Sequence, residues 1–311
     1  MTQFKLLTYR DAAGQPRAGV EIAGEVHDAA RLTGNGADCA VLAMIEDWAE
    51  AEPRIARSAE KAGASTLVGA MASLTLLSPL LYPGSIFCAA ANYADHADAM
   101  ARKMGRPGEP DPKSLGLKPF HFLKPVRQSV IGTGVDIDLP DFAEKIDWEI
   151  ELAAVIGRPA RHVSAERALD YVAGYTIAND VSVRDAQFMR RPNVPDGSLF
   201  KTDFIGMKGF DKSCVLGPCI TPASQIGDPD NLAMKLWLDD ELMQNSNTGK
   251  MIFSTAEQIA YLSERVTLLP GDVVLTGTPA GTGAEQDRFL KKGQTIRMWI
   301  ENIGETCNRT A

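Results

Sequence analysis

Three carboxylates occupy positions from which two neighbouring strands would bring them together. Glu149 and Glu151 fall within an extended pattern over 148–155, and Asp180 closely follows an apolar run over 175–178. Because side chains alternate along a strand, Glu149 and Glu151 would share one face, and the second strand would deliver Asp180 from its end. Hard cations such as Mg²⁺, Mn²⁺ or Ca²⁺ prefer oxygen ligands of this kind, so the spacing predicts a metal site.

The same Glu-x-Glu pattern also occurs on the solvent-facing side of an ordinary strand. Against this alternative, the chain continues as an apolar run over 152–157, which is typical of a strand buried on both faces. Two carboxylates at the end of such a strand need compensation, and a bound cation supplies it. With only 4 histidines in the chain and no paired cysteines nearby, softer metals are disfavoured.

Two further segments carry polar groups at the end of a predicted strand or in a turn. A strand beginning near residue 87 runs into Tyr93 and His96, where functional side chains are usually exposed, although a lone histidine also serves as a surface or capping residue. Lys208 lies in the glycine-flanked segment 206–209, which would let the backbone approach a ligand closely or would form an ordinary turn with a solvated lysine.

A buried strand predicted from residue 271 opens into a Gly/Thr-rich loop that reaches 283. The loop lacks the Gly-Lys-Ser/Thr of a phosphate-binding P-loop and differs from the glycine turn that opens a dinucleotide-binding helix. Its backbone N–H groups and the Thr278 hydroxyl are instead suited to binding an oxyanion or a carboxylate.

Composition restricts the class of protein and its partners. The chain has 311 residues, of which 45% are hydrophobic and 23% charged, so it can bury a sizeable core in one large or two unequal domains. A formal net charge of −8 disfavours nucleic acid or an anionic membrane as the main partner, because both attract a basic surface. An anionic substrate would need local cations or a metal.

The cellular location is predicted from cysteines and from apolar runs. The 5 cysteines are odd in number, widely spaced and without a C-x-x-C pair, which favours reduced thiols in a reducing compartment. Residues 1–5 do not resemble a signal peptide, and no apolar run approaches the ~20 residues that a membrane span requires. We therefore expect a cytoplasmic protein without a membrane partner.

The predicted elements fall into two regions. In the first, strands over 4–9 and 18–22 form a hairpin, and a mostly helical stretch over 39–64 is broken at Pro53. A linker over 76–83 follows. From residue 86, short strands alternate with turns, and the helices are predicted over 165–172 and over 255–266, the latter behind a Ser254/Glu257 capping box.

The sequence thus predicts an α+β, β-rich fold with a small N-terminal α+β domain over 1–82 and a larger domain over 83–311. Within the larger region, six motifs occur in a fixed order, at 92–96, 122–125, 147–151, 174–185, 208–211 and 275–279. In their residues and in their order along the chain, these motifs resemble those of the fumarylacetoacetate hydrolase family over about 86–310. The first eighty or so residues look like the small N-terminal domain of many bacterial members, which is a weaker match.

This resemblance implies a mixed β-roll catalytic domain and a homodimer. It implies that Glu149, Glu151 and Asp180 bind Mg²⁺ or Mn²⁺, with Ca²⁺ as a possible substitute in a crystal. The other implied site residues are His96 and Lys208 as catalytic groups, and Tyr93, Arg184, Gln187, Gly277 and Thr278 around the substrate. Arg184 could equally be a structural ion-pair partner.

The implied substrate is a small anionic 2-oxo or β-diketo acid, whose carboxylate and neighbouring carbonyl can chelate one hard cation. Chelation stabilises the enolate that forms when a C–C bond breaks. We therefore expect a Mg²⁺- or Mn²⁺-dependent hydrolase of an acylpyruvate-like diketo acid, in which His96 activates water. The alternatives are a 2-oxo acid decarboxylase, tautomerase or hydratase with the same metal site, and a non-catalytic domain whose metal only crosslinks strands.

One departure from the family pattern bears on this choice. Hydrolytic relatives usually carry a glutamate three residues after the histidine, whereas this chain has Ala99. Asp95, Asp98 or Glu109 could substitute for that glutamate. The Gly/Pro-rich segment 105–116, which contains Glu109, has the composition of a lid that orders over substrate, or of a disordered surface loop.

Overall fold

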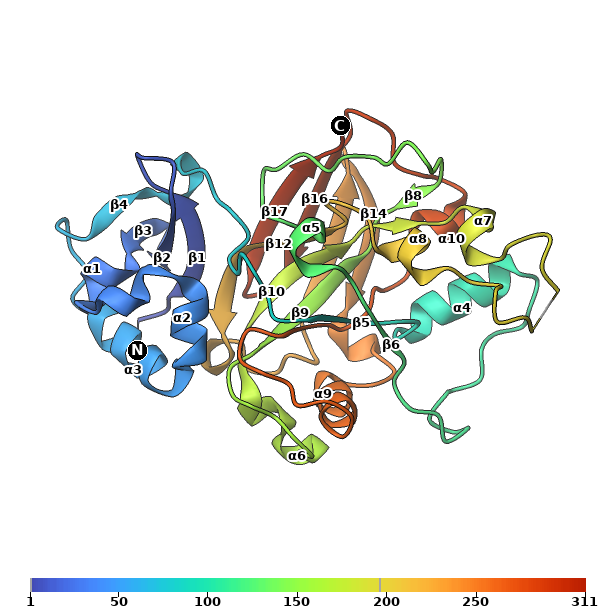
Figure 1. Cartoon of the computed structure of the whole chain (residues 1–311), viewed down its shortest axis with the longest axis horizontal. Coiled ribbons are helices and arrows are strands. Elements are labelled where there is room, and N and C mark those ends of the chain that lie inside the picture. Colours follow the sequence, from blue (N-terminus) through green and yellow to red (C-terminus); the bar gives the residue numbers. More distant parts are fainter. Residues whose placement is uncertain (1, 196) are drawn as a thin grey trace.

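One mixed sheet runs through the whole molecule in the computed structural model, which describes residues 2–195 and 197–311 (Figure 1). Met1, in the predicted N-terminal segment, and Asp196, in the second half of the chain, lie outside the described residues. The α+β, sheet-rich class expected from the sequence is confirmed.

The described strands form three sheets. The 11-stranded sheet has the order β4 (Leu67–Ala70), β3 (Glu25–Asp28), β2 (Pro16–Ile22), β1 (Lys5–Arg10), β12 (Cys214–Pro222), β10 (Val172–Asp180), β9 (Ile150–Ile156), β15 (Val273–Leu275), β5 (Ile86–Ala89) and β6 (His121–Leu123), with β7 (Val130–Ile131) paired to β12. A 4-stranded sheet has the order β14 (Glu241–Asn247), β13 (Ala233–Leu238), β16 (Thr295–Ile300) and β17 (Gly304–Arg309). A 2-stranded ribbon joins β8 (Ile146–Asp147) to β11 (Ser182–Val183).

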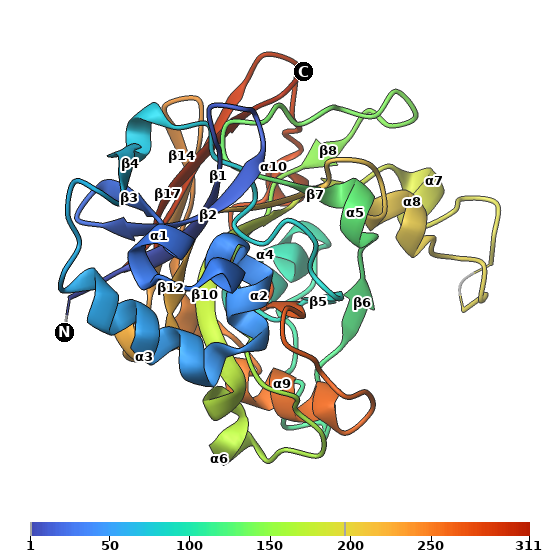
Figure 2. The same cartoon turned by 60° about the vertical axis from the view of Figure 1, so that its left-hand side comes forward.

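Short helices surround these sheets (Figure 2). They are α1 (Ala29–Thr33), α2 (Val41–Glu46) and α3 (Trp48–Ala59) in the N-terminal lobe, and α4 (Ala94–Lys103), α5 (Val126–Ser129), α6 (Ala165–Ala168), α7 (Ala186–Met189), α8 (Phe204–Lys208), α9 (Thr255–Ser263) and α10 (Gly283–Gln286) in the larger lobe. None of the helices in the described ranges is long and apolar enough to cross a membrane.

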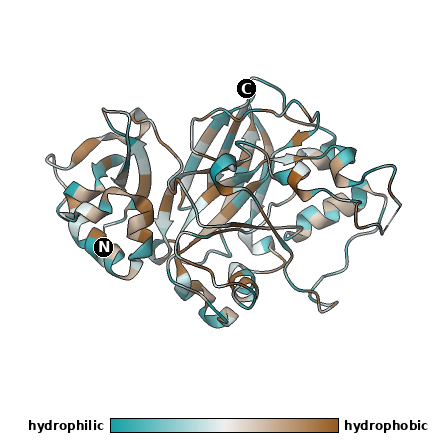
Figure 3. Ribbon diagram, viewed as in Figure 1, coloured by the Kyte–Doolittle hydropathy of each residue, from teal (hydrophilic) through white to brown (hydrophobic). Residues whose placement is uncertain are grey.

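The alternation of side chains explains where the core lies. In β9, Ile150, Leu152 and Ala154 belong to a cluster shared with the four-stranded sheet, whereas Ala153 and Val155 point into a second cluster on the other face. The prediction of a strand buried on both faces is therefore confirmed. Hydrophobic residues follow the central strands in Figure 3, whereas the outer helices mix both kinds.

Several element boundaries differ from the predictions. Pro53 lies inside α3 rather than breaking it, because the helix buries Trp48, Ala51, Ile55 and Ala59 while Pro53 faces solvent. The helix expected over 165–172 is present as α6 followed by a 3-10 turn over Leu169–Tyr171, and it stops one residue early because Val172 begins β10.

Other predictions are confirmed directly. The hairpin of β1 and β2 is present, with Leu6 opposite Val20. The capping box of α9 is also present, since the Ser254 hydroxyl accepts from the Glu257 N–H and the Glu257 carboxylate accepts from the Ser254 N–H. All five cysteines are free.

The two lobes share a sheet and a core. Strand β1 joins β12 antiparallel through Leu6 and Ile220, and both side chains are completely buried. The same hydrophobic cluster contains Ile45 from α2 and Val155 from β9. The boundary at residue 82 stays a prediction, but the contacts couple the lobes physically.

We expect Leu6→Ala to destabilise the whole chain rather than the N-terminal lobe alone. The substitution leaves a cavity between β1 and β12, with a cost of about 2–5 kcal/mol. Chemical denaturation followed by both fluorescence and far-UV circular dichroism should show one transition at a lower midpoint. Leu67→Ala, at a residue that is 37% exposed in β4, is the control and should move the midpoint little. Two separate transitions, with only the first displaced, would contradict the shared core.

Candidate active site

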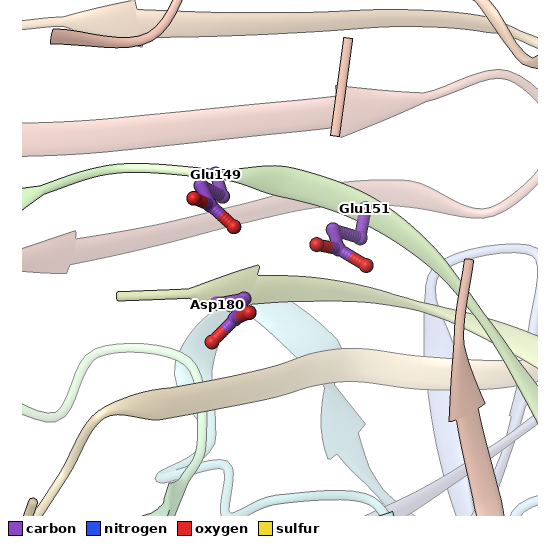
Figure 4. A group of neighbouring side chains, drawn as sticks. All are labelled: Glu149, Glu151 and Asp180. Carbon is purple, nitrogen blue, oxygen red and sulfur yellow. The ribbon is translucent and has the colours of Figure 1, made fainter. Parts of the chain in front are cut away.

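The three predicted carboxylates come together at the ends of two adjacent strands. Glu149 directly precedes β9, Glu151 lies near the start of β9 where it pairs with β10, and Asp180 ends β10 (Figure 4). One oxygen from each carboxylate lies within 4.8 Å of the others, and all three residues are buried. The convergence predicted from spacing is therefore present.

The local backbone differs from a continuous strand over 148–155. Strand β9 begins at Ile150, and Glu149 lies between β8 and β9. The Asn179 side chain accepts from the Glu149 N–H at 2.9 Å, and the Asp180 N–H donates to the Glu149 carbonyl at 3.0 Å. These bonds replace regular ladder pairing and hold Glu149 beside Asp180.

Two buried lysines bind the triad. Nζ of Lys208 donates to Oε2 of Glu149 at 2.8 Å and to Oδ2 of Asp180 at 2.6 Å. Nζ of Lys124 donates to the other Asp180 oxygen at 2.5 Å. Lys208 is thus neither a turn residue nor solvated, because it ends helix α8 and is 6% exposed. Lys124 belongs to the sequence motif at 122–125, but the sequence did not indicate that this lysine pairs with Asp180.

Arg184 completes the ring of cations. Its Nη2 contacts Glu149, and its Nε donates to Asp147 at 3.0 Å. Asp147 also accepts from the N–H groups of Gly283 and Ala284, at 2.6 Å and 3.0 Å. Arg184 therefore lies at the site and forms ion pairs there, and its role toward substrate stays a prediction.

The cations act unequally on the carboxylates. Burial would raise the pKa of Glu149, but Lys208, Arg184 and, more weakly, His96 lower it to about 2. Glu149 is consequently ionised at neutral pH.

Glu151 has the opposite balance. Burial, followed by the charges of Asp180 and Glu149, raises its pKa well above the ordinary value. Its Oε2 accepts from the Gly277 N–H at 2.6 Å, whereas Oε1 is buried without a hydrogen-bond partner. An orphaned carboxylate oxygen facing two other carboxylates marks the position where positive charge is missing.

Formal charges support the same conclusion. Within the described part of the chain, this cluster contains four buried carboxylates and three cations, which leaves a charge of −1: Asp147, Glu149, Glu151 and Asp180 against Lys124, Arg184 and Lys208. A divalent cation would change this to +1, which suits an anionic ligand. The all-oxygen donor set fits Mg²⁺ or Mn²⁺, so the residues match the expected cofactor.

The loop after β15 orients the ligand strand. Gly277 has φ +98°, and a Cβ there would approach the Asn92 Cβ to 2.9 Å, so glycine is required for its N–H to reach Glu151. The Thr278 hydroxyl donates to the Ile150 carbonyl and accepts from Gln244, both at 2.9 Å. The substrate-binding role of Gly277 and Thr278 stays a prediction.

His96 faces a partner that the sequence did not reveal. Its Nδ1 lies 2.5 Å from Oε1 of Glu285, on α10, and the two side chains are 16% and 10% exposed. Two of the substitutes considered for Ala99 bind elsewhere, since Asp95 accepts from Ser246 and Glu109 pairs with Arg106.

Two predicted substrate residues lie away from the carboxylates' hydrogen bonds. The Tyr93 hydroxyl donates to the Met234 sulfur at 3.4 Å inside the core. The Gln187 amide donates to the Phe142 carbonyl at 3.1 Å on an exposed part of α7. Their roles toward substrate stay predictions.

A cavity of about 490 Å³ adjoins His96. It lies between α4 and the segment 105–117, which forms turns without helix or strand. Much of its lining is apolar, from Met100, Met104, Leu115, Leu117 and Ile252. The expected lid thus borders the candidate site, although closure is a prediction.

Comparisons with known proteins show what this chain is similar to. Residues 85–311 match the family model described as fumarylacetoacetate (FAA) hydrolase C-terminal. Fumarylacetoacetate hydrolase domain-containing protein 2 of Pongo abelii is 40% identical over 238 residues, which are 76% of this chain and 69% of that protein. The Homo sapiens protein named mitochondrial oxaloacetate tautomerase FAHD2B is 37% identical, with the same coverage.

Solved structures are similar along nearly the whole chain. Fumarylacetoacetate hydrolase from psychrophilic Exiguobacterium antarcticum has a TM-score of 0.78 at 27% identity, covering 99% of each chain. Maleylpyruvate hydrolase from Sphingobium sp. SYK-6, in complex with manganese(II) ion and pyruvate, has a TM-score of 0.72 at 29% identity, covering 98% of each chain.

We expect Glu151→Gln to stabilise the metal-free protein while abolishing its stabilisation by Mn²⁺. Glutamine keeps an oxygen for the Gly277 N–H but removes the repelled charge, a gain on the order of 1–3 kcal/mol. Because the folded pKa of Glu151 is raised, stability from its protonation is present at low pH and lost as the pH rises through that pKa. The advantage should therefore be larger at pH 8 than at pH 5.

Thermal melting in EDTA and in Mn²⁺, at both pH values, measures this effect. The exposed Glu264→Gln is the matched control, with no change expected in either condition. A metal-free Glu151→Gln protein that melts below wild type at pH 8, and still gains from Mn²⁺, would refute the site.

Proposed function

The chain belongs to the fumarylacetoacetate hydrolase family, and on that premise we propose that it hydrolyses a C–C bond of an acylpyruvate-like diketo acid in a metal-dependent reaction. The observation that carries the proposal is the pairing of His96 with a carboxylate beside the acidic triad. A histidine held in this way can accept a proton from water. Hydrolysis of a chelating substrate needs a base that activates water and a hard cation that binds the substrate oxygens. A histidine with a fixed orientation beside an acidic triad can supply the first and hold the second.

Mg²⁺ or Mn²⁺, held by Glu149, Glu151 and Asp180, supplies polarisation of a carbonyl oxygen and stabilisation of the negative charge that develops there. The positive charges around the triad attract the substrate carboxylate. In this proposal Lys208, which binds Glu149 and Asp180 when substrate is absent, turns one of its N–H donors toward the substrate oxygens.

The proton transfers fall to His96. Nε2 takes a proton from the water that attacks the second carbonyl, and the new C–O bond forms at that carbon. The C–C bond then breaks, its electron pair stays on the carbon next to the 2-oxo group, and His96 returns the proton there. The products are a carboxylic acid and a 2-oxo acid.

The apolar cavity beside His96 supports a substrate with an extended distal group. Met100, Leu115 and Ile252 can contact hydrocarbon, whereas the carboxylate end lies at the charged cluster. This division matches a molecule that is anionic at one end and less polar at the other.

A second function is favoured by the relatives. Proteins 37% to 40% identical include ones named oxaloacetate tautomerase, which implies proton transfer at carbon without an attacking water. Ala99 first favoured this alternative, because it removes the usual partner of the histidine. The contact between His96 and Glu285 weakens that argument, so hydrolysis remains the leading proposal.

A homodimer in the cytoplasm also belongs to the proposal. Support for dimerisation comes from exposed apolar side chains in and beside β6 and on α8: Phe120, Leu123, Phe204 and Ile205 are between 41% and 64% exposed. A surface of this kind often marks a protein contact. The location rests on the sequence alone.

Acylpyruvates and oxaloacetate, assayed side by side with Mg²⁺ or Mn²⁺ and with products identified by mass, discriminate the reactions. We expect cleavage of an acylpyruvate by the wild type and a loss of about 10²-fold or more in kcat for His96→Ala. Oxaloacetate turnover that needs no attacking water should be affected less. If the wild type leaves every acylpyruvate intact but interconverts the oxaloacetate tautomers, the hydrolase proposal is wrong.

Lys208→Met should lower kcat/KM by about 10²-fold or more, because it keeps the aliphatic length but removes the charge. Mn²⁺ binding, measured by calorimetry, should persist, since the two carboxylates lose a competing cation. Lys212→Met is the control, because Lys212 pairs with the exposed Asp138 outside the cluster. Wild-type kinetics in Lys208→Met would remove Lys208 from the catalytic groups.

A further inference from the structure

The contact between His96 and Glu285 joins two short helices that are far apart in the sequence. His96 lies in the first turn of α4 and Glu285 in α10, separated by 189 positions. The Nδ1 to Oε1 distance is 2.5 Å, and both side chains are largely buried. The contact is therefore a short hydrogen bond shielded from water.

The chemistry of the two groups fixes the direction of this bond. An ionised carboxylate oxygen can only accept, so Nδ1 of His96 must donate. In the neutral ring this leaves Nε2 without a proton and able to act as a base. The carboxylate thereby selects the tautomer as well as the ring orientation.

The Glu285 carboxylate is itself held in place. Its Oε2 accepts from the Gly281 N–H at 2.8 Å, and its Oε1 lies 3.4 Å from the Thr282 hydroxyl. Lys103 at the end of α4 pairs with Asp287 at 2.6 Å, which ties the two helices together. Helix capping would explain the Oε2 contact and the long contact from Thr282, but it does not explain the much shorter contact of Oε1 with His96.

The neighbouring carboxylate of Asp95 has different partners. Asp95 accepts from Ser246, Lys250 and the Ala280 N–H. Position 99, one helical turn beyond His96, carries no polar group.

We propose that Glu285 is the positioning residue of His96 and takes the place of a carboxylate absent at position 99. This inference rests on the proposed function, in which Nε2 of His96 moves a proton. It adds that the loop after β15 supplies both the backbone donor to Glu151, through Gly277, and the carboxylate that orients the base.

Glu285→Gln tests the proposal with little change in shape. The single amide oxygen is needed by the Gly281 N–H, so the amide NH₂ turns toward Nδ1 and requires it to accept. The proton then moves to Nε2, which can no longer act as a base. We expect kcat to fall about 10²-fold or more, with KM and Mn²⁺ affinity within about threefold of wild type.

The tautomer is measured directly, without substrate. ¹⁵N-histidine NMR, with the His96 signals assigned by comparison with His96→Gln, should show a protonated Nδ1 in wild type and a protonated Nε2 in Glu285→Gln. Asp287→Asn, directly after the same helix, is the matched control, because Asp287 is exposed and the asparagine keeps a polar group for Lys103. It should change neither the tautomer nor kcat.

A rescue variant separates positioning from general structure. Ala99→Glu in the Glu285→Gln background places a carboxylate three positions after His96, on the same face of α4. It should restore the Nδ1–H tautomer and recover at least tenfold of the lost kcat.

The measurements distinguish failure of the role proposed for Glu285 from failure of the proposed function. An unchanged His96 tautomer in Glu285→Gln overturns the proposal, as does an unchanged kcat in an active enzyme. If the wild type turns over none of the tested acids, the proposed function fails, and the tautomer measurement alone then supports or overturns the role of Glu285.

Discussion

Burial of mutually repelling carboxylates at the ends of β9 and β10 is the constraint on which the site depends. Glu149, Glu151 and Asp180 converge in the protein interior, and such a cluster is unstable unless positive charge surrounds it. Lys208 and Lys124 supply part of that charge, yet Oε1 of Glu151 still lacks a partner. The fold thus holds buried carboxylates whose negative charge is only partly compensated by lysines, and a divalent cation would supply the missing positive charge.

The loop after β15, with helix α10, contacts both the buried carboxylates and His96, the proposed base. Gly277 binds Glu151 through its N–H, and a few residues later Glu285 binds His96. Gly283 and Ala284 bind Asp147, which in turn pairs with Arg184. One short segment therefore orients the carboxylates, their counter-charge and the base, and a displacement of α10 would disturb both Asp147 with its partner Arg184 and His96.

The sequence allowed prediction of features that depend on local periodicity. Spacing along the chain predicted that Glu149 and Glu151 meet Asp180, because Glu151 lies in β9 beside the end of β10, although Glu149 precedes the strand. The capping box of α9 was equally local. By contrast, the helix through Pro53 depends on packing of its buried face, and the pair of His96 and Glu285 spans 189 positions. Local pattern carries no information on such contacts, which arise only when the sheet assembles.

The central claim is that the carboxylates of β9 and β10 form one divalent cation site beside His96. Anomalous diffraction from crystals grown with Mn²⁺ tests it most directly, because the manganese signal locates the ion independently of any assumed ligand. The account predicts a single strong peak bounded by oxygens of Glu149, Glu151 and Asp180, with the Glu151 Oε1 among the ligands. Fully occupied manganese elsewhere, with Glu151 still unpartnered, would contradict it.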